Sequence, residues 1–480
     1  MKSRSIALLS ALALVALAVP AGAFDPCPTG VACTEYTGAG KDGSYFRILV
    51  PPDWDGDLVV YGHGFDLNRS HIRGHATCEN RGTQHCEADT DCDPGVACNY
   101  ISMSGLDALL LPMGKAVAAT TYSDTGWAPF HSAKNIKEIL KFAKKEPTIG
   151  KPTRVIVTGH SGGGAVTADA TFKLKIDGAV PMCGAVAGGL PTWDTAVDVR
   201  LVYDFLCDGV YGAKFKSAPD KGEDSGTSET DMALTVDRCF GVLFPSSDPE
   251  EAAAQTQRLA DFITLTKFTG TGMEVLSAMG FATLGLGDFV YDDARLKGKR
   301  MGFNADPDLD YSAMGDDPVL GAAYDTGVKR LTKGDGRKLL TKASYPDFTK
   351  GKGKKVAYPI LSMAGAADWL VIPPFQSVYD SAAQIGGKSL TQTWVDTYGH
   401  CSFSEQETQA LFNVYFDWLD SADYTLSPPA PEDVRQACLA LPGGVDGDTC
   451  NFNSGYVNTN LYDRIPPRSD WPLAALPPTP

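Results

Sequence analysis

The sequence predicts an α/β fold, in which helices cover both faces of a mostly parallel sheet. Three observations support this class. Short β-branched runs alternate with segments of helical spacing, a glycine-rich corner joins one such run to a helix, and the alternation resumes late in the chain after a long helical interruption. With 480 residues the chain can form one enlarged domain or two.

The elements of the first half follow in order along the chain. β-branched and aromatic runs bounded by glycine or proline predict strands, and apolar residues recurring on one side predict helices. The predicted strands are residues 45–50, 57–61, 116–121, 154–158 and 178–187, and the predicted helices are 132–145 and 163–172.

Helical spacing then dominates, for example over residues 250–266 and 318–331. Alternation resumes with strands at 356–365 and 389–395 and a helix at 404–419.

These elements divide the chain into segments. We expect a core of residues 24–190 and 355–425, interrupted by a Cys-rich insertion at about 66–104. Residues 191–354 are expected to form a helical cap or lid, and residues 426–480, rich in proline and asparagine, a tail that wraps the surface.

The first residues have the three parts of a secretory signal peptide. Lys2 and Arg4 precede an apolar stretch over residues 6–19, and Ala21-Gly22-Ala23 offers a cleavage site. An N-terminal membrane anchor is the alternative, but the apolar stretch is short for a bilayer. We therefore predict residues 1–23 to be a signal peptide and the mature chain to be secreted, either extracellular or periplasmic.

All twelve cysteines follow that site, which predicts disulfides in an oxidising compartment. Spacing suggests Cys27 with Cys33, Cys438 with Cys450, and local bridges among Cys78, Cys86, Cys92 and Cys98. A zinc site is disfavoured because the sequence has no C-x-x-C pair and no suitable histidine spacing.

Charge and composition exclude several partners. The formal net charge of −16 predicts repulsion of nucleic acid and anionic lipid, and no later segment resembles a transmembrane helix. The acidic triplets at residues 89–93 and 306–310 lack the glycine and glutamate of a calcium loop, so we interpret them as solvated loops. No metal and no cofactor is expected.

The glycine-rich corner carries a candidate nucleophile. Gly159-His160-Ser161-Gly162-Gly163 fits G-x-S-x-G, and it lies between a strand and a helix as that motif requires. Such a turn lifts the serine hydroxyl above the sheet and needs glycines where side chains would collide. The alternatives are a strand–helix turn with an incidental serine, or a phosphate loop, which the lack of a following lysine disfavours.

A serine nucleophile needs a base and an acid that orients the base, in the chain order serine, acid, histidine. Asp368 follows a predicted strand, and His400 lies in the turn before the last predicted helix. Asp396 is the rival acid, and His160 and His131 are histidines with poorer placements.

Two backbone amides are candidate oxyanion donors. Gly162 N–H follows the serine directly, and Phe65 N–H follows the early strand in "YGHGF", with Gly64 as a less favoured donor. A tight turn without this role is the alternative reading of that stretch.

The segments "YGHGF", "TGHSGGG", "GAADWLVIP" and "YGHCSF" resemble the α/β-hydrolase superfamily over residues 40–190 and 355–425. The resemblance implies the α/β-hydrolase fold and a serine hydrolase that cleaves small or polymeric carboxylic esters through an acyl-enzyme intermediate. It implies Ser161 as nucleophile, His400 as general base and acid, and Asp368 as its orienter. A serine peptidase on the same fold and a non-catalytic binding module are the alternatives.

Tannases and feruloyl esterases resemble the chain at His400-Cys401, but there the cysteine pairs with one placed directly before the serine. Here His160 occupies that position. Cys401 must therefore bridge elsewhere or remain unpaired, and that substrate class is not predicted.

Overall fold

The computed structural model describes residues 27–471 with several gaps. These gaps are residues 66–75, 79–80, 86–97, 101–102, 124–125, 224–225, 268–271, 281, 284–294, 308, 313, 315, 344–358, 388, 422–426 and 462–464. The predicted signal peptide lies outside the described residues, as do Cys86 and Cys92 of the Cys-rich insertion. Cys78 and Cys98 lie opposite each other on the described strands β4 (Ala76–Cys78) and β6 (Cys98–Tyr100), and the bridges predicted within the insertion stay predictions. No helix in the described part has the length and apolar character that a bilayer span requires.

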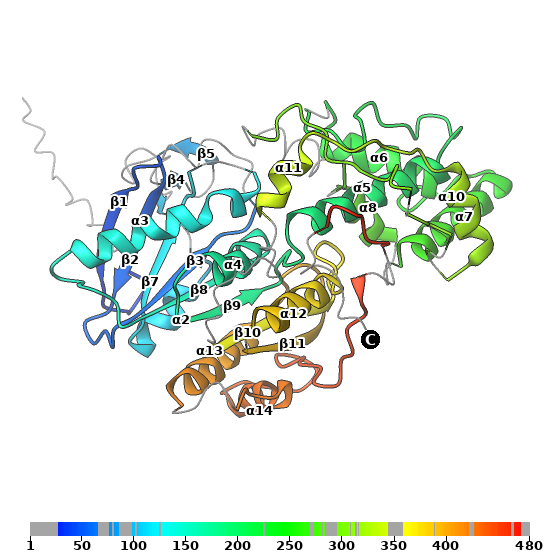
Figure 1. Cartoon of the computed structure of the whole chain (residues 1–480). Coiled ribbons are helices and arrows are strands. Elements are labelled where there is room, and N and C mark those ends of the chain that lie inside the picture. Colours follow the sequence, from blue (N-terminus) through cyan, green and yellow to red (C-terminus); the bar gives the residue numbers. More distant parts are fainter. Residues whose placement is uncertain are drawn as a thin grey trace, which may run out of the picture.

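An eight-stranded sheet forms the centre of the described structure, with the strand order β1-β2-β7-β3-β8-β9-β10-β11 (Figure 1). β2 runs antiparallel to β1 and to β7, and all other neighbouring pairs are parallel. The strands are β1 (Thr34–Ala39), β2 (Tyr45–Val50), β3 (Asp57–Gly62), β7 (Ala116–Thr120), β8 (Arg154–His160), β9 (Gly178–Met182), β10 (Pro359–Ala367) and β11 (Ser389–Tyr398). The predicted fold class is confirmed.

Helices cover both faces of this sheet because successive strand side chains point to opposite sides. On β3, Leu58 and Val60 join one buried apolar cluster, whereas Val59 and Tyr61 join the other. The first cluster is completed by α3 (Ser132–Lys145), α4 (Gly162–Lys173) and α12 (Phe375–Gly386), and the second by α2 (Leu106–Leu110) and α13 (Glu405–Asp420).

The strand after α4 is shorter than predicted. The apolar run 178–187 predicts one strand, but β9 ends at Met182. A methyl group on Gly184 would lie 2.8 Å from the carbonyl carbon of Gly164, so the chain turns there against the start of α4. Close backbone approach therefore ends the strand, although the apolar pattern continues.

A group of helices follows β9 and lies to one side of the sheet (Figure 1, green). They are α5 (Gly189–Leu206), α6 (Glu229–Phe240), α7 (Pro249–Thr266), α8 (Gly272–Gly280), α10 (Pro318–Gly327) and α11 (Arg337–Leu340). A disulfide between Cys207 and Cys239 joins the end of α5 to α6. The start of α5 follows β9 closely, so this group is connected directly to the core.

The C-terminal segment packs against other helices in addition to following the surface. It forms α14 (Pro431–Ala440), and its last part (Figure 1, red) lies among the helices that follow β9. Arg468 is buried, and its guanidinium donates hydrogen bonds to both carboxylate oxygens of Asp198 on α5, each at 2.6 Å. Trp471 is also buried, and its indole N–H donates to Asp194 on α5 at 2.5 Å. The last described residues therefore fix the position of α5.

α4 contains a buried carboxyl group that predicts a pH dependence of stability. Asp169 pairs with Lys173, and its other carboxylate oxygen has no hydrogen-bond partner. Burial raises the pKa of Asp169 from its usual 3.8 to about 6, with the charge of Lys173 acting in the opposite direction. Because the folded state holds this proton more tightly than the unfolded state, the contribution of Asp169 to stability falls as the pH rises from about 4 to about 6.

We expect the stability of Asp169→Asn, relative to that of the parent, to increase as the pH rises. The difference in the free energy of unfolding should be on the order of 2–3 kcal/mol more favourable to the variant at pH 7 than at pH 4. The measurement is the unfolding midpoint of both proteins across this pH range, since subtraction removes the titration of other groups. If the difference in stability between the two proteins did not change with pH, burial would not raise the pKa of Asp169.

Candidate active site

Ser161 occupies the corner between β8 and α4 with a strained backbone. Its φ of 56° and ψ of −118° lie where residues with a side chain are rarely found. Its N–H donates to the Met182 carbonyl at 3.1 Å, and its own carbonyl accepts from the amides of Ala165 and Ala185. The surrounding backbone therefore holds the serine in a conformation that an isolated chain would leave.

Glycines make this corner possible. A methyl group on Gly163 would lie 1.8 Å from the Gly62 carbonyl oxygen, and one on Gly159 would lie 2.4 Å from the same atom. A methyl group on Gly164 would lie 2.5 Å from the Cα of Gly184. The corner therefore fits between the ends of β3 and β9 only if these three positions carry no side chain.

The structure brings Asp368 and His400 together. Nδ1 of His400 lies 2.8 Å from Oδ2 of Asp368. Because a carboxylate only accepts, Nδ1 carries a proton, and in the tautomer with a single ring proton Nε2 is then the acceptor. The other oxygen of the buried Asp368 accepts from the amides of Leu370 and Val371, each at 2.9 Å. The carboxylate is therefore fixed on both oxygens.

A disulfide ties the His400 turn to the serine corner. Cys401 bridges Cys183, with 5.3 Å between their Cα atoms. Cys183 directly follows Met182, whose carbonyl accepts from Ser161 N–H. Both cysteines have positive φ values, 40° for Cys183 and 54° for Cys401. Cys401 was expected either to form a bridge elsewhere or to remain unpaired. The structure shows the bridge, and its partner Cys183 lies at the strand end beside Ser161.

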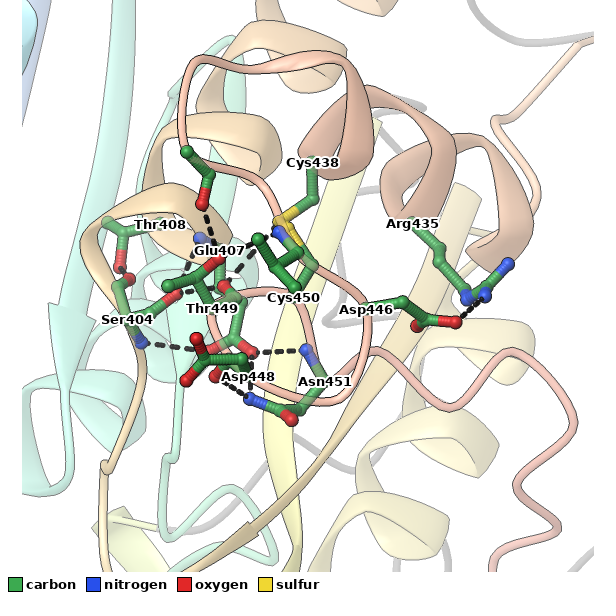
Figure 2. The surroundings of a disulfide bond; sticks show 12 residues. Ser404, Glu407, Thr408, Arg435, Cys438, Asp446, Asp448, Thr449, Cys450 and Asn451 are labelled. Atoms are coloured by element: carbon green, nitrogen blue, oxygen red, sulfur yellow. Dashed lines mark hydrogen bonds and ion pairs between the residues drawn. A yellow bond between two sulfur atoms is a disulfide. The ribbon is translucent and has the colours of Figure 1, made fainter.

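The other side of the His400 turn is fixed by the C-terminal segment (Figure 2). Ser404 caps α13 and donates its hydroxyl to the Thr449 carbonyl at 2.5 Å. Glu407, fully buried, accepts from the amides of Ser404 at 2.8 Å and Asn451 at 2.7 Å. The predicted Cys438–Cys450 disulfide is confirmed and closes the loop that carries these partners, as is the predicted Cys27–Cys33 bridge near the N-terminus.

The rival acid lies in a different environment. Both carboxylate oxygens of Asp396 accept from the side-chain amide of Asn453, at 3.1 and 2.9 Å. Its backbone N–H donates to the Asn451 carbonyl, which ties the end of β11 to the C-terminal segment. Asp396 therefore holds the strand that leads to His400, whereas Asp368 binds the imidazole itself.

The rival histidines lack a carboxylate partner of this kind. Nδ1 of His160 lies 3.3 Å from the Tyr61 hydroxyl. Burial, and then the nearby His400, lower the pKa of His160 to about 4. Burial, and then Arg295, lower the pKa of His131 to about 4 as well. Both rings are therefore neutral at pH 7, and neither is oriented by an acid.

Ser161 and His400 are not hydrogen-bonded to each other in this structure. The serine hydroxyl has no hydrogen-bond partner among the described residues, and Nε2 of His400 lies 3.4 Å from Sγ of Cys401. Catalytic hydrogen bonds are often long before substrate binds. The Cys183–Cys401 bridge joins the turn that carries His400 to the strand end beside Ser161.

The candidate oxyanion donors lie on adjoining segments. A methyl group on Gly162 would lie 3.0 Å from the Phe65 nitrogen, and one on Gly64 would lie 3.6 Å from Cβ of Ser161. His63 Nδ1 donates to the Gly64 carbonyl at 2.8 Å. In a trans peptide the N–H points away from the carbonyl, so this bond helps to set the direction of Phe65 N–H.

Aromatic side chains border this region on the Phe65 side. The ring of Phe65 lies 6.4 Å from that of Trp127 and 6.3 Å from that of Trp193 on α5, centroid to centroid. The two indoles meet edge to face at 5.4 Å. Two buried indoles, one from the core and one from α5, therefore pack at steep angles to each other beside Phe65.

Carboxylates of the second acidic triplet accept hydrogen bonds from backbone amides. Asp306 accepts from the amide of Ser469, and Asp310 accepts from that of Ser312. The first triplet lies outside the described residues. Among the described residues, no group of three or more His, Cys, Asp or Glu side chains is arranged to hold a metal ion.

The glycine corner generates a prediction about folding. We expect Gly163→Ala to lose more than about 4 kcal/mol of stability or to fail to fold, because its methyl group would overlap a backbone carbonyl. Gly455→Ala is the matched control, since Gly455 is exposed and its nearest contact would be 3.7 Å away. It should stay within about 0.5 kcal/mol of the parent. Thermal and urea unfolding measure both, and equal stabilities would contradict the packing described.

No family model matches the sequence, and no curated protein matches it. Solved structures do resemble the chain. Feruloyl esterase B from Aspergillus oryzae has 10% identity and a TM-score of 0.42, covering 81% of this chain and 82% of its own. Lipase A from Candida antarctica in its closed state has 11% identity and a TM-score of 0.36, covering 84% and 85%.

An acylaminoacyl peptidase from Pyrococcus horikoshii has 11% identity and a TM-score of 0.40, covering 84% of this chain. The chain spans only 44% of that peptidase's length. At these identities and TM-scores the likenesses assign no residue role. The strand order, in which β2 runs antiparallel to both of its neighbours and all other neighbouring strands are parallel, describes an α/β fold with a mostly parallel sheet.

Proposed function

We propose that the chain is a serine hydrolase that cleaves carboxylic esters through an acyl-enzyme intermediate. The observation that carries this proposal is the Cys183–Cys401 bridge, which ties the Asp368-bound His400 to the strand end that holds Ser161. A nucleophile, a base and an orienting acid that arrive on three separate turns act together only if the fold holds those turns against one another.

In the acylation step, Ser161 Oγ attacks the ester carbonyl carbon while His400 Nε2 takes the hydroxyl proton. The C=O electrons move to the oxygen, and the N–H groups of Gly162 and Phe65 stabilise that negative charge, aided by the N-terminus of α4. When the carbonyl re-forms, the bond to the alcohol oxygen breaks and His400 returns the proton to that oxygen. The alcohol leaves, and the acyl group stays on Ser161.

In the deacylation step, water repeats this chemistry. His400 takes a proton from water as its oxygen bonds to the acyl carbon, and the resulting oxyanion uses the same two amides. The bond to Ser161 Oγ then breaks, and His400 protonates the serine. A carboxylic acid is released, and the cycle closes with every proton moved by His400 and no cofactor consumed.

Two further features fit this function. Disulfides at Cys27–Cys33, Cys183–Cys401, Cys207–Cys239 and Cys438–Cys450 suit a protein exported to an oxidising compartment. The helices from α5 to α11 act as a cap in this proposal, because α5 places Trp193 against Phe65, whose amide is a proposed oxyanion donor.

The assignment of the nucleophile is tested by labelling. A fluorophosphonate should modify the parent at Ser161 and leave Ser161→Ala unlabelled. His400→Ala should lower kcat on p-nitrophenyl acetate by about three orders of magnitude or more, because the serine then lacks its base. Asp396→Asn is the control and should keep most of the activity. Labelling at another residue, or full activity of His400→Ala, would overturn the proposal, and preferential cleavage of peptide anilides would indicate the peptidase alternative.

The disulfide tether gives a second prediction. The double variant Cys183→Ala/Cys401→Ala should lower kcat about tenfold to a hundredfold with little change in KM, because displacement of His400 by about 1 Å is costly. The control is Cys207→Ala/Cys239→Ala, which removes a disulfide within the helical group. Steady-state kinetics on folded samples, verified by circular dichroism, measure both. Equal losses of kcat in the two variants would mean that the tether acts only through stability.

A further inference from the structure

A buried tyrosine lies beside the segment that carries the candidate oxyanion amides. Tyr122 follows β7, is 2% exposed, and donates its hydroxyl to the His63 carbonyl at 3.1 Å. A methyl group on Gly62 would lie 2.8 Å from that hydroxyl and 3.4 Å from the Cα of Gly163. The hydroxyl of Tyr122 therefore reaches the contact at which the end of β3 meets the start of α4.

The backbone of Tyr122 is held in a conformation that is rare for a bulky residue. Its φ is 57°. Its N–H donates to Oγ1 of Thr120 at 3.1 Å, and its carbonyl accepts from Oγ1 of Thr121 at 2.9 Å. Such strain persists only where the surroundings enforce it, and it occurs often at functional positions. Two neighbouring hydroxyl groups thus fix the turn from which the tyrosine reaches β3.

Two successive peptide groups of the oxyanion segment are fixed through their carbonyls. The Tyr122 hydroxyl binds the His63 carbonyl, and Nδ1 of His63 donates to the Gly64 carbonyl at 2.8 Å. In a trans peptide the N–H points away from the carbonyl, so each bond also sets the direction of the next N–H. These N–H groups belong to Gly64 and Phe65, which are the two candidate donors on this segment.

Tyr122 supports the second of these bonds as well as the first. The rings of Tyr122 and His63 pack with their centroids 4.3 Å apart and 36° between their planes, which restricts the orientation of Nδ1. Burial, and then Tyr61, raise the pKa of Tyr122 well above its usual 10. Its hydroxyl therefore keeps its proton at neutral pH and remains a donor. One side chain holds the first carbonyl directly and the second through the His63 ring.

We propose that Tyr122 is a positioning residue, which holds residues 63–65 so that their amides face the oxyanion before substrate binds. The inference rests on the proposed function, since it concerns how the donors of that same site are directed. Tyr122 acts through the His63 carbonyl and ring rather than by touching a reacting atom. Donors whose direction is fixed in advance stabilise the transition state without reorganisation during the reaction.

Tyr122→Phe tests this proposal, because it keeps the ring and removes the hydroxyl. We expect kcat on p-nitrophenyl acetate to fall about tenfold or more with KM within about twofold of the parent, since the amides act mainly in the transition state. A trifluoromethyl ketone that adds to Ser161 and forms an oxyanion should bind more weakly by a similar factor. The corresponding methyl ketone, used as a probe of ground-state binding, should bind as before.

Tyr415→Phe is the matched control. Tyr415 on α13 is fully buried, and its hydroxyl also donates to a backbone carbonyl, that of Pro359, at 3.3 Å. Pro359 begins β10, whereas Ser161 follows the end of β8, and the strands from β8 to β10 are parallel. The control bond therefore lies at the opposite edge of the sheet. Its loss should lower stability and leave kcat and both inhibition constants unchanged.

A second variant covers the case in which Tyr122→Phe does not fold. Thr120→Val removes the acceptor of the Tyr122 N–H, so it should lower kcat and trifluoromethyl ketone affinity in the same proportion. Unchanged kcat in a folded variant, or a loss of kcat without weaker binding of the trifluoromethyl ketone, would overturn the proposal. Either result, with turnover still dependent on Ser161, would leave the proposed function intact. Turnover that does not depend on Ser161 would instead refute the proposed function.

Discussion

The close approach of the Ser161 corner to the ends of β3 and β9 is the constraint on which the rest of the site depends. Gly163 lies against the Gly62 carbonyl and Gly164 against Gly184, so no side chain fits at these contacts. The approach has several consequences. It sets Ser161 at a positive φ, it brings the segment ending at Phe65 beside the first amide of α4, and it places Cys183 at the neighbouring strand end. A candidate nucleophile, two amides and a tether point thus follow from one packing arrangement.

The position of His400 depends on parts of the chain that are far apart in sequence. Cys183 and Cys401 are separated by 218 residues, and their bridge fixes one side of the His400 turn. The buried Glu407 fixes the other side through the amides of Ser404 and Asn451. Closing a loop over such a distance costs conformational entropy, which the packing of the sheet and the disulfides offset. The C-terminal segment is therefore part of the support of the site.

Much of this arrangement could be predicted because its signals are local or follow chain order. The strands around Ser161 are β-branched runs, and Asp368 and His400 each follow a predicted strand in the expected order. The partner of Cys401 could not be predicted, since Cys183, Cys207, Cys239 and Cys401 can pair in three ways. The early end of β9 was missed because a backbone approach leaves no apolar signal. The burial of Arg468 was missed because its partner Asp198 lies 270 residues away.

The covalent intermediate is the most direct point at which to test the central claim. Parent protein mixed with p-nitrophenyl acetate and quenched with acid within milliseconds should carry one acetyl group per chain, located by peptide mass spectrometry on Ser161. The account predicts a matching burst of p-nitrophenol before the steady state. Hydrolysis that proceeds with no acetylated chain in the quenched samples and no burst, or an acetyl group on a residue other than Ser161, would contradict it.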